Sequence, residues 1–176
     1  MDEPVLQPGA IAEPAPGGLV LNVSSDPANL APVRWACEAF CRRQGLDDAA
    51  AGDVGLCVNE AMANVTRHAY GGATDRPVSV IAEALDERGT VVPDGATVAN
   101  SVRVTLRDWG NGVNPLMQPQ KERDPFEPGG LGLICLRQLV DECAFEPQRD
   151  GMRLVMVKRK GKKRNRGQGS GVEVRS

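Results

Sequence analysis

The sequence predicts an α+β fold, a two-layer sandwich in which helices cover one face of a sheet. The apolar spacing alternates in some segments and follows a helical period in others, in the order strand, two helices, two strands, loop, helix and two strands. The 176 residues suffice for one domain but not for two well-packed ones. Hydrophobic residues make up 41% and charged residues 25%, and no stretch reaches the roughly 18 apolar residues of a membrane span.

The first half of the expected core begins with a strand over 19–23, where apolar and polar residues alternate. Pro27 stands at the start of a helix over about 28–44, whose apolar residues recur at helical spacing and which Gly45 ends. A second helix, over about 49–68, begins after two aspartates that cap its first turn, and two glycines follow its end.

The second half adds four strands and one helix. Residues 77–85 and 101–108 alternate as half-buried strands, and we expect them to pair as antiparallel neighbours. The polar segment 86–100 between them is longer than a tight hairpin. After a loop that contains four prolines, a helix is expected over 131–142. A closing hairpin follows, with strands over 143–147 and 153–158.

Charge is distributed unevenly along the chain. The formal net charge is −2, yet residues 158–176 hold eight Lys or Arg against one acidic residue. We therefore expect a folded domain over 18–158, between a proline-rich disordered tail at 1–17 and a basic disordered tail at 159–176. The basic tail has two interpretations, a solubilising extension or an electrostatic arm for an acidic partner or nucleic acid.

Cysteine usage indicates neither a disulfide framework nor a zinc site. The five cysteines include no CxxC pair and are accompanied by a single histidine, so most are expected to be buried thiols. The N-terminus has acidic residues and no apolar core, unlike a secretion signal, which favours a cytoplasmic protein. An aromatic content of 3% argues against a dedicated nucleic-acid binder.

Glu60 and Asn64 stand about one turn apart on the second expected helix, which places a carboxylate and a carboxamide on one face. The carboxamide supplies a neutral oxygen suited to Mg²⁺, and the carboxylate can accept a proton or orient a hydroxyl. Arg67 continues the same face. Taken alone, this pattern is also typical of a solvated polar surface.

A second motif follows the strand over 101–108. Asp108 ends that strand, and Gly110 and Gly112 come after it. A carboxylate at a strand end can accept a hydrogen bond from an exocyclic amine, while glycines let the chain turn tightly beside a ring. The same DxGxG spacing also occurs in ordinary turns.

A glycine-rich run opens the helix expected over 131–142. Backbone N–H groups and the helix dipole at such a position favour phosphate oxygens. The run is neither a P-loop nor a dinucleotide-binding fingerprint, and an alternative is a plain loop-to-helix junction. It consists of Gly129, Gly130, Leu131, Gly132 and Leu133.

The order of these three motifs is that of the N, G1 and G2 boxes, and together they resemble the ATP-binding domain shared by gyrase, heat-shock chaperones of the ninety-kilodalton class, histidine kinases and MutL. Within that superfamily, called GHKL, the chain is most similar to the bacterial anti-sigma-factor serine/threonine kinases, the RsbW-like group. The resemblance covers about residues 19–160 and is carried by 59–70, 107–113, 124–133 and 154–158.

The resemblance implies the Bergerat fold, with ATP and Mg²⁺ as cofactors. It implies that Asn64 ligates Mg²⁺, that Glu60 is the general base and that Asp108 binds the adenine amine. Arg67 matches a position that reaches phosphate in related kinases, with an exposed ion-pairing arginine as the alternative, and His68 is expected to be structural. The remaining residues expected to border the nucleotide are Gly110, Gly112, Gly129, Gly130, Leu131, Gly132 and Leu133.

The resemblance also implies a function. A protein of this group transfers the γ-phosphoryl of ATP to a Ser or Thr of an anti-sigma-factor antagonist, binds a sigma factor and forms a homodimer. The short lid between 112 and 129 favours such a regulatory kinase over a gyrase-type motor. The alternative is a nucleotide-gated module that sequesters its partner without phosphoryl transfer.

Overall fold

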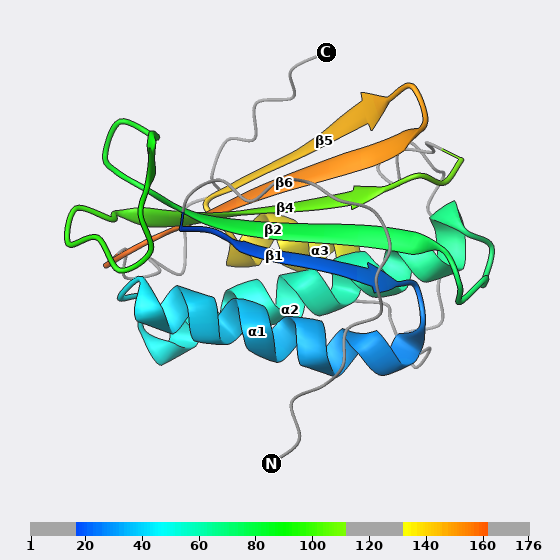
Figure 1. Cartoon of the computed structure of the whole chain (residues 1–176), viewed down its shortest axis with the longest axis horizontal. Coiled ribbons are helices and arrows are strands. Elements are labelled where there is room, and N and C mark those ends of the chain that lie inside the picture. Colours follow the sequence, from blue (N-terminus) through cyan, green and yellow to red (C-terminus); the bar gives the residue numbers. More distant parts are fainter. Residues whose placement is uncertain (1–16, 112–131, 162–176) are drawn as a thin grey trace.

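The protein has a six-stranded antiparallel sheet with helices packed on one face (Figure 1). The computed structural model describes residues 17–111 and 132–161, with side chains for 17–111 and 136–161. The strand order is β1-β2-β4-β6-β5, and a two-residue strand, β3, pairs with β2. The strands are β1 (Leu19–Ser24), β2 (Pro77–Leu85), β3 (Val91–Val92), β4 (Ser101–Asp108), β5 (Glu142–Gln148) and β6 (Gly151–Arg159).

Within residues 17–111 and 132–161, the helical layer consists of three α-helices and two short turns. A 3-10 turn, η1 (Pro27–Asn29), leads into α1 (Leu30–Arg43), and α2 (Asp48–Asn64) continues into a π turn, η2 (Val65–Ala69). The third helix, α3 (Gly132–Leu139), packs against α2. Asp47 caps α2 as expected, because its carboxylate accepts a hydrogen bond of 2.7 Å from the Ala50 N–H.

The hydrophobic core lies between the helices and the facing side of the sheet. Along β4 the buried residues alternate, with Val102, Val104 and Leu106 pointing into the core. On α2 the buried residues follow the helical period and include Val58 and Met62. The α+β two-layer fold and the antiparallel pairing of 77–85 with 101–108 are therefore confirmed.

The last helix is shorter than the sequence predicts. It ends at Leu139 instead of 142, because the chain beyond it is drawn into the sheet. The Asp141 N–H donates to the Val157 carbonyl at 2.9 Å, and the Asp141 carboxylate accepts from the Arg159 N–H at 2.8 Å. These bonds begin the pairing of β5 with β6, so residues 140–142 cannot continue the helix.

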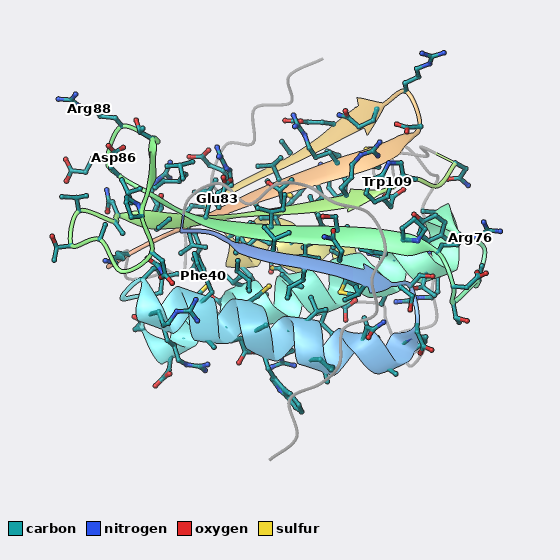
Figure 2. The ribbon with its side chains drawn as sticks, in the orientation of Figure 1. Phe40, Arg76, Glu83, Asp86, Arg88 and Trp109 are labelled. Carbon is teal, nitrogen blue, oxygen red and sulfur yellow. The ribbon has the colours of Figure 1, made fainter. Side chains whose placement is uncertain are left out.

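The polar segment 86–100 forms structure that apolar spacing did not indicate. It contains β3, and its Asp94 carboxylate accepts a hydrogen bond from the Gln44 side chain at the end of α1. The Gln44 side-chain oxygen in turn accepts from the Gly95 N–H at 3.1 Å. The segment thus packs against the C-terminal end of α1 instead of forming a free loop. Figure 2 shows its first part, at Asp86 and Arg88, at the far end of the sheet from Trp109.

Lys158 is part of the folded core, although composition alone groups it with the basic tail. Its side chain is only 10% exposed, and its ammonium group lies 2.9 Å from the Asp53 carboxylate and 2.6 Å from the Leu139 carbonyl. The strand continues to Arg159, so the sheet extends into the expected tail. Residues 1–16 and 162–176 lie outside the described part of the chain, and their expected disorder stays a prediction.

Replacement of Lys158 by Met is expected to lower the free energy of unfolding by about 1 to 2 kcal/mol, because the Asp53 carboxylate and the Leu139 carbonyl both lose a charged donor. Urea denaturation measures this loss. The matched control is Arg103→Met, which breaks the more exposed ion pair with Glu83 and should cost less than about 1 kcal/mol. Equal costs for the two variants would show that the Lys158 cluster does not stabilise the core.

None of the helices that the structure describes is both long enough and apolar enough to cross a membrane.

Candidate functional site

A pocket opens between the C-terminal end of α2 and the ends of β4 and β6. It encloses about 470 Å³ of space, part of which is continuous with solvent. One side is a stripe of the helix at spacings of three and four residues, and the other side is apolar except for one carboxylate. The described lining residues are Ala61, Asn64, Val65, His68, Ala69, Leu106, Asp108, Leu136, Phe145, Met152 and Leu154. Such a hollow suits a flat apolar ring with one polar edge.

Asp108 is the polar group of the apolar side. It is the last residue of β4 and is only 3% exposed. One carboxylate oxygen, Oδ1, accepts a hydrogen bond of 2.9 Å from the Gly110 N–H. Burial raises the pKa of the Asp108 carboxyl above its ordinary value, and the Gly110 N–H and the Arg107 guanidinium oppose that rise. The site thus holds a buried carboxylate whose charged form would be stabilised by a ligand that donates a hydrogen bond.

The raised pKa predicts how stability depends on pH. A carboxyl whose pKa is higher in the folded than in the unfolded chain stabilises the fold at low pH, and this contribution is lost as pH rises through the folded pKa. The free energy of unfolding of Asp108→Asn, minus that of the wild type, should therefore increase from about pH 4 upward and then level off. Urea denaturation across about pH 4 to 8 measures it. A constant or decreasing difference would contradict the assignment.

Asn64 lies on the helical side of the pocket, at the point where α2 changes into η2. Its carboxamide makes no hydrogen bond with any residue that the structure describes. The π turn is closed by a bond of 3.0 Å from the Tyr70 N–H to the Val65 carbonyl, five residues back. A polar side chain that has no hydrogen-bond partner in the described part of the chain and lies beside a pocket is available to a ligand.

Glu60 lies about one turn before Asn64 on α2 and is half-buried. Its Oε2 atom is buried and has no hydrogen-bond partner in the described part of the chain. Glu60 itself is not among the described residues that line the pocket. A buried carboxylate oxygen without a donor is costly unless a ligand or a proton satisfies it. The structure therefore places Glu60 on the helix that forms the pocket wall, with one oxygen unsatisfied.

Arg67 is exposed and is not among the described residues that line the pocket. Its Nε donates to the Ala63 carbonyl of the preceding turn at 3.2 Å. This position fits the alternative of a surface arginine better than a phosphate contact. His68, in contrast, lines the pocket, and its carbonyl accepts a hydrogen bond of 3.3 Å from the Asn111 side chain. The structure thus places His68 beside the pocket, where the resemblance expects it.

The glycine motifs are described only in part. A Cβ atom on Gly110 would lie 2.6 Å from the Ala69 carbonyl oxygen, so the chain after Asp108 needs a glycine to pass the end of η2. Gly132 and Leu133 begin α3, but their side chains are not described. The other expected residues, Gly112, Gly129, Gly130 and Leu131, lie outside the described part of the chain. Whether they border a nucleotide stays a prediction.

The apolar wall is the part of the site that sequence reasoning did not identify. Leu136 comes from α3, Phe145 from β5, and Met152 and Leu154 from β6. The alternation of apolar residues along β6 was a signal that these two side chains share one face. It contained no information about which part of that face would be left open as a pocket. Tyr70, whose hydroxyl accepts a hydrogen bond from the N–H of Trp109, the residue after Asp108, was also not singled out.

Comparisons with known proteins show which family of folds this architecture belongs to. No curated protein matches the chain. The fold is similar to that in a crystal structure of the RsbU and RsbW domains of Rv1364c from Mycobacterium tuberculosis, with a TM-score of 0.55 and 20% sequence identity. That match covers 81% of this chain and 32% of the other, so this chain spans about a third of its length. A model of the histidine kinase-like ATPase domain matches residues 23–158, and the chain therefore belongs to the family of histidine kinase-like ATPase domains.

Proposed function

We propose that this chain is an ATP-dependent serine/threonine protein kinase of the anti-sigma-factor type. Family membership implies nucleotide binding. The observation that carries the proposal is the pocket in which the buried carboxylate of Asp108 faces the helix stripe that contains Asn64. These two groups match the two ends of a nucleotide. The Asp108 carboxylate suits a base that donates a hydrogen bond, and the Asn64 carboxamide suits the phosphate end.

The adenine ring is proposed to lie between the apolar wall and the helix. Leu106, Met152 and Phe145 provide apolar surface for the ring. Asp108 is proposed to accept a hydrogen bond from the exocyclic amine, which is charge-assisted and therefore stronger than a neutral pair. A guanine ring carries a carbonyl at the corresponding position, so the same carboxylate would repel it.

The phosphate end is assigned to Asn64. A Mg²⁺ ion commonly retains several waters and takes one or two protein oxygens in addition to substrate phosphates. The described residues contain no cluster of three or more acidic, histidine or cysteine side chains, and the Asn64 carboxamide, which makes no hydrogen bond with any of them, fits such a sparsely coordinated ion. When bound, Mg²⁺ would neutralise phosphate charge.

Glu60 is proposed to orient the incoming Ser or Thr hydroxyl and accept its proton. The hydroxyl oxygen forms a bond to the γ-phosphorus while the bond from that phosphorus to the β,γ-bridging oxygen breaks, and ADP leaves. The buried Oε2 atom, which lacks a donor in the described part of the chain, supports this role. Most of the rate enhancement would come from positioning and charge stabilisation, as in phosphoryl transfer generally.

The partners follow from the same proposal. The structurally similar protein contains an RsbW domain, which supports an anti-sigma-factor antagonist as the phosphorylated protein and a sigma factor as the sequestered one. A homodimer and a cytoplasmic location belong to the proposal as well. Nucleic acid and membranes are not part of it.

One observation favours a second candidate, a nucleotide-gated module that binds its partner without phosphoryl transfer. Glu60 does not line the pocket within the described residues, so its carboxylate is not yet beside the space where a nucleotide would lie. The two candidates share the proposed nucleotide site and differ only in whether a phosphoryl group is transferred to the partner.

The test is to incubate the purified chain with γ-labelled Mg-ATP and a panel of small anti-sigma-factor antagonist proteins. The kinase proposal expects label on a Ser or Thr of one antagonist. The binding-module alternative expects nucleotide-dependent association of the chain with a partner and no label on any antagonist. Absence of nucleotide binding altogether would contradict both.

A further inference from the structure

We propose that Tyr70 is a positioning residue for nucleotide recognition. Its hydroxyl is inferred to hold Asp108 in the orientation that accepts the adenine amine. Tyr70 does not line the pocket in the described part of the chain, so recognition of the base would depend on a side chain that never touches it. This inference rests on the proposed function, in which adenine binds at Asp108.

The Tyr70 hydroxyl joins three segments of the chain. It donates to the Pro77 carbonyl at 2.6 Å and accepts from the Trp109 N–H at 2.7 Å. Tyr70 follows the π turn η2, Pro77 begins β2, and Trp109 comes directly after Asp108. Figure 2 shows Trp109 where β4 ends. Both partners are backbone groups, so the hydroxyl fixes the path of the chain and not a mobile side chain.

The residues after Asp108 form a short strap, defined as residues 109–111, which is attached to the end of η2 at every position. Gly110 packs against Ala69 so closely that a Cβ atom would lie 2.6 Å from its carbonyl oxygen. The Asn111 N–H donates to that same carbonyl at 3.3 Å. With the bond from Trp109 to Tyr70, three successive residues contact 68–70.

The strap in turn contributes to how Asp108 presents its carboxylate. The Gly110 N–H donates to Asp108 Oδ1 at 2.9 Å, and the Met152 backbone also hydrogen-bonds the carboxyl, so the strap provides one of the two backbone contacts that orient the carboxyl plane. Without the Tyr70 hydroxyl, the Trp109 N–H would lose its acceptor and the strap its attachment nearest to Asp108. A carboxylate held by only one of its two backbone contacts is oriented less well toward a directional donor.

The chemistry of the hydroxyl suits this double role. Burial raises the pKa of the Tyr70 phenol above its ordinary value, and the Trp109 N–H opposes that rise. The phenol therefore remains protonated at neutral pH and can donate to Pro77 while it accepts from Trp109. A phenylalanine would keep the ring and lose both bonds.

The experiment compares Tyr70→Phe with the wild type in binding two nucleotides by calorimetry. The nucleotides are ATP and purine riboside triphosphate, which lacks the exocyclic amine. The variant should bind ATP roughly three- to tenfold more weakly and the analogue as well as before, so its preference for ATP should shrink by the same factor. The matched control is Thr66→Val, which removes another hydroxyl at this end of the fold, one that donates to the Ser25 carbonyl at 2.8 Å. It should keep the full preference for ATP.

A double-variant cycle tests whether Tyr70 acts through Asp108. In an Asp108→Ala background, Tyr70→Phe should cause no further loss of ATP affinity. An equal loss for both nucleotides, a full loss in the Asp108→Ala background, or an unchanged preference for ATP would each overturn the inference. If the wild type itself shows no preference for ATP over the analogue, the proposed adenine site fails, which distinguishes that failure from one confined to Tyr70.

A second measurement keeps the inference testable if Tyr70→Phe does not fold. The chain has a single tyrosine, so growth with 3-fluorotyrosine labels Tyr70 alone and keeps its hydroxyl. The labelled protein should retain the preference for ATP, and its fluorine resonance should shift more with ATP than with purine riboside triphosphate. A resonance that responds to neither nucleotide, or equally to both, would overturn the inference.

Discussion

Replacement of Glu60 by Gln is expected to abolish most phosphoryl transfer while leaving nucleotide binding nearly intact. The amide keeps the size of the carboxylate and much of its hydrogen bonding, but it cannot accept the hydroxyl proton. General-base catalysis typically contributes about 10²- to 10⁴-fold, so transfer to the antagonist should slow by about that factor. Single-turnover measurements with labelled ATP give the rate, and calorimetry gives the affinity.

Two controls make this result specific. Glu87→Gln changes an exposed carboxylate in the segment 86–100 and should leave both rate and affinity unchanged. Asn64→Ala should weaken Mg-ATP binding as well as transfer, because it removes the proposed metal ligand. Transfer at the wild-type rate by Glu60→Gln would show that Glu60 is not the base. Absence of transfer by the wild type would leave the nucleotide-gated module as the function.

Replacement of Asp108 by Ala is expected to reduce ATP affinity by about ten- to hundredfold, since the adenine amine loses a charge-assisted acceptor. Calorimetric titration with ATP measures the change. The control Asp75→Ala removes an exposed carboxylate of the turn before β2 and should bind ATP normally. Unchanged affinity in a folded Asp108→Ala protein would remove the basis for placing adenine in this pocket.

The strands at the centre of the sheet were predictable because their signal is local. Residues 101–108 alternate regularly and residues 77–85 alternate over much of their length, and β2 and β4 have those bounds. The motif order also indicated that Asn64 and Asp108 belong to one site, and both line the pocket. In each case the information lay within a few residues or in the order of short motifs.

The features that were missed depend on contacts between distant segments. Lys158 was expected to end the last strand, but a lysine beside a run of basic residues gives no local sign of burial, and only its pairing with Asp53, more than 100 residues earlier, shows that it is buried. The change from α2 to the π turn at Val65 was hidden because Val65 continues the apolar period of the helix. A change to hydrogen bonds between residues five apart does not alter the spacing of apolar residues along the helix, so the sequence gives no sign of it.

The π turn limits the insertions and deletions that this part of the chain can accept. Each residue of an α-helix advances the chain by about 100° around the helix axis, so losing one residue between Asn64 and Tyr70 would turn the tyrosine to a different side. Its hydroxyl would then face neither Pro77 nor Trp109. The segment 86–100, at the opposite end of β2, carries no such constraint toward the pocket. A one-residue deletion in 65–69 should therefore weaken ATP binding, whereas a change of length in 86–100, which affects the contact with α1, should leave ATP binding intact.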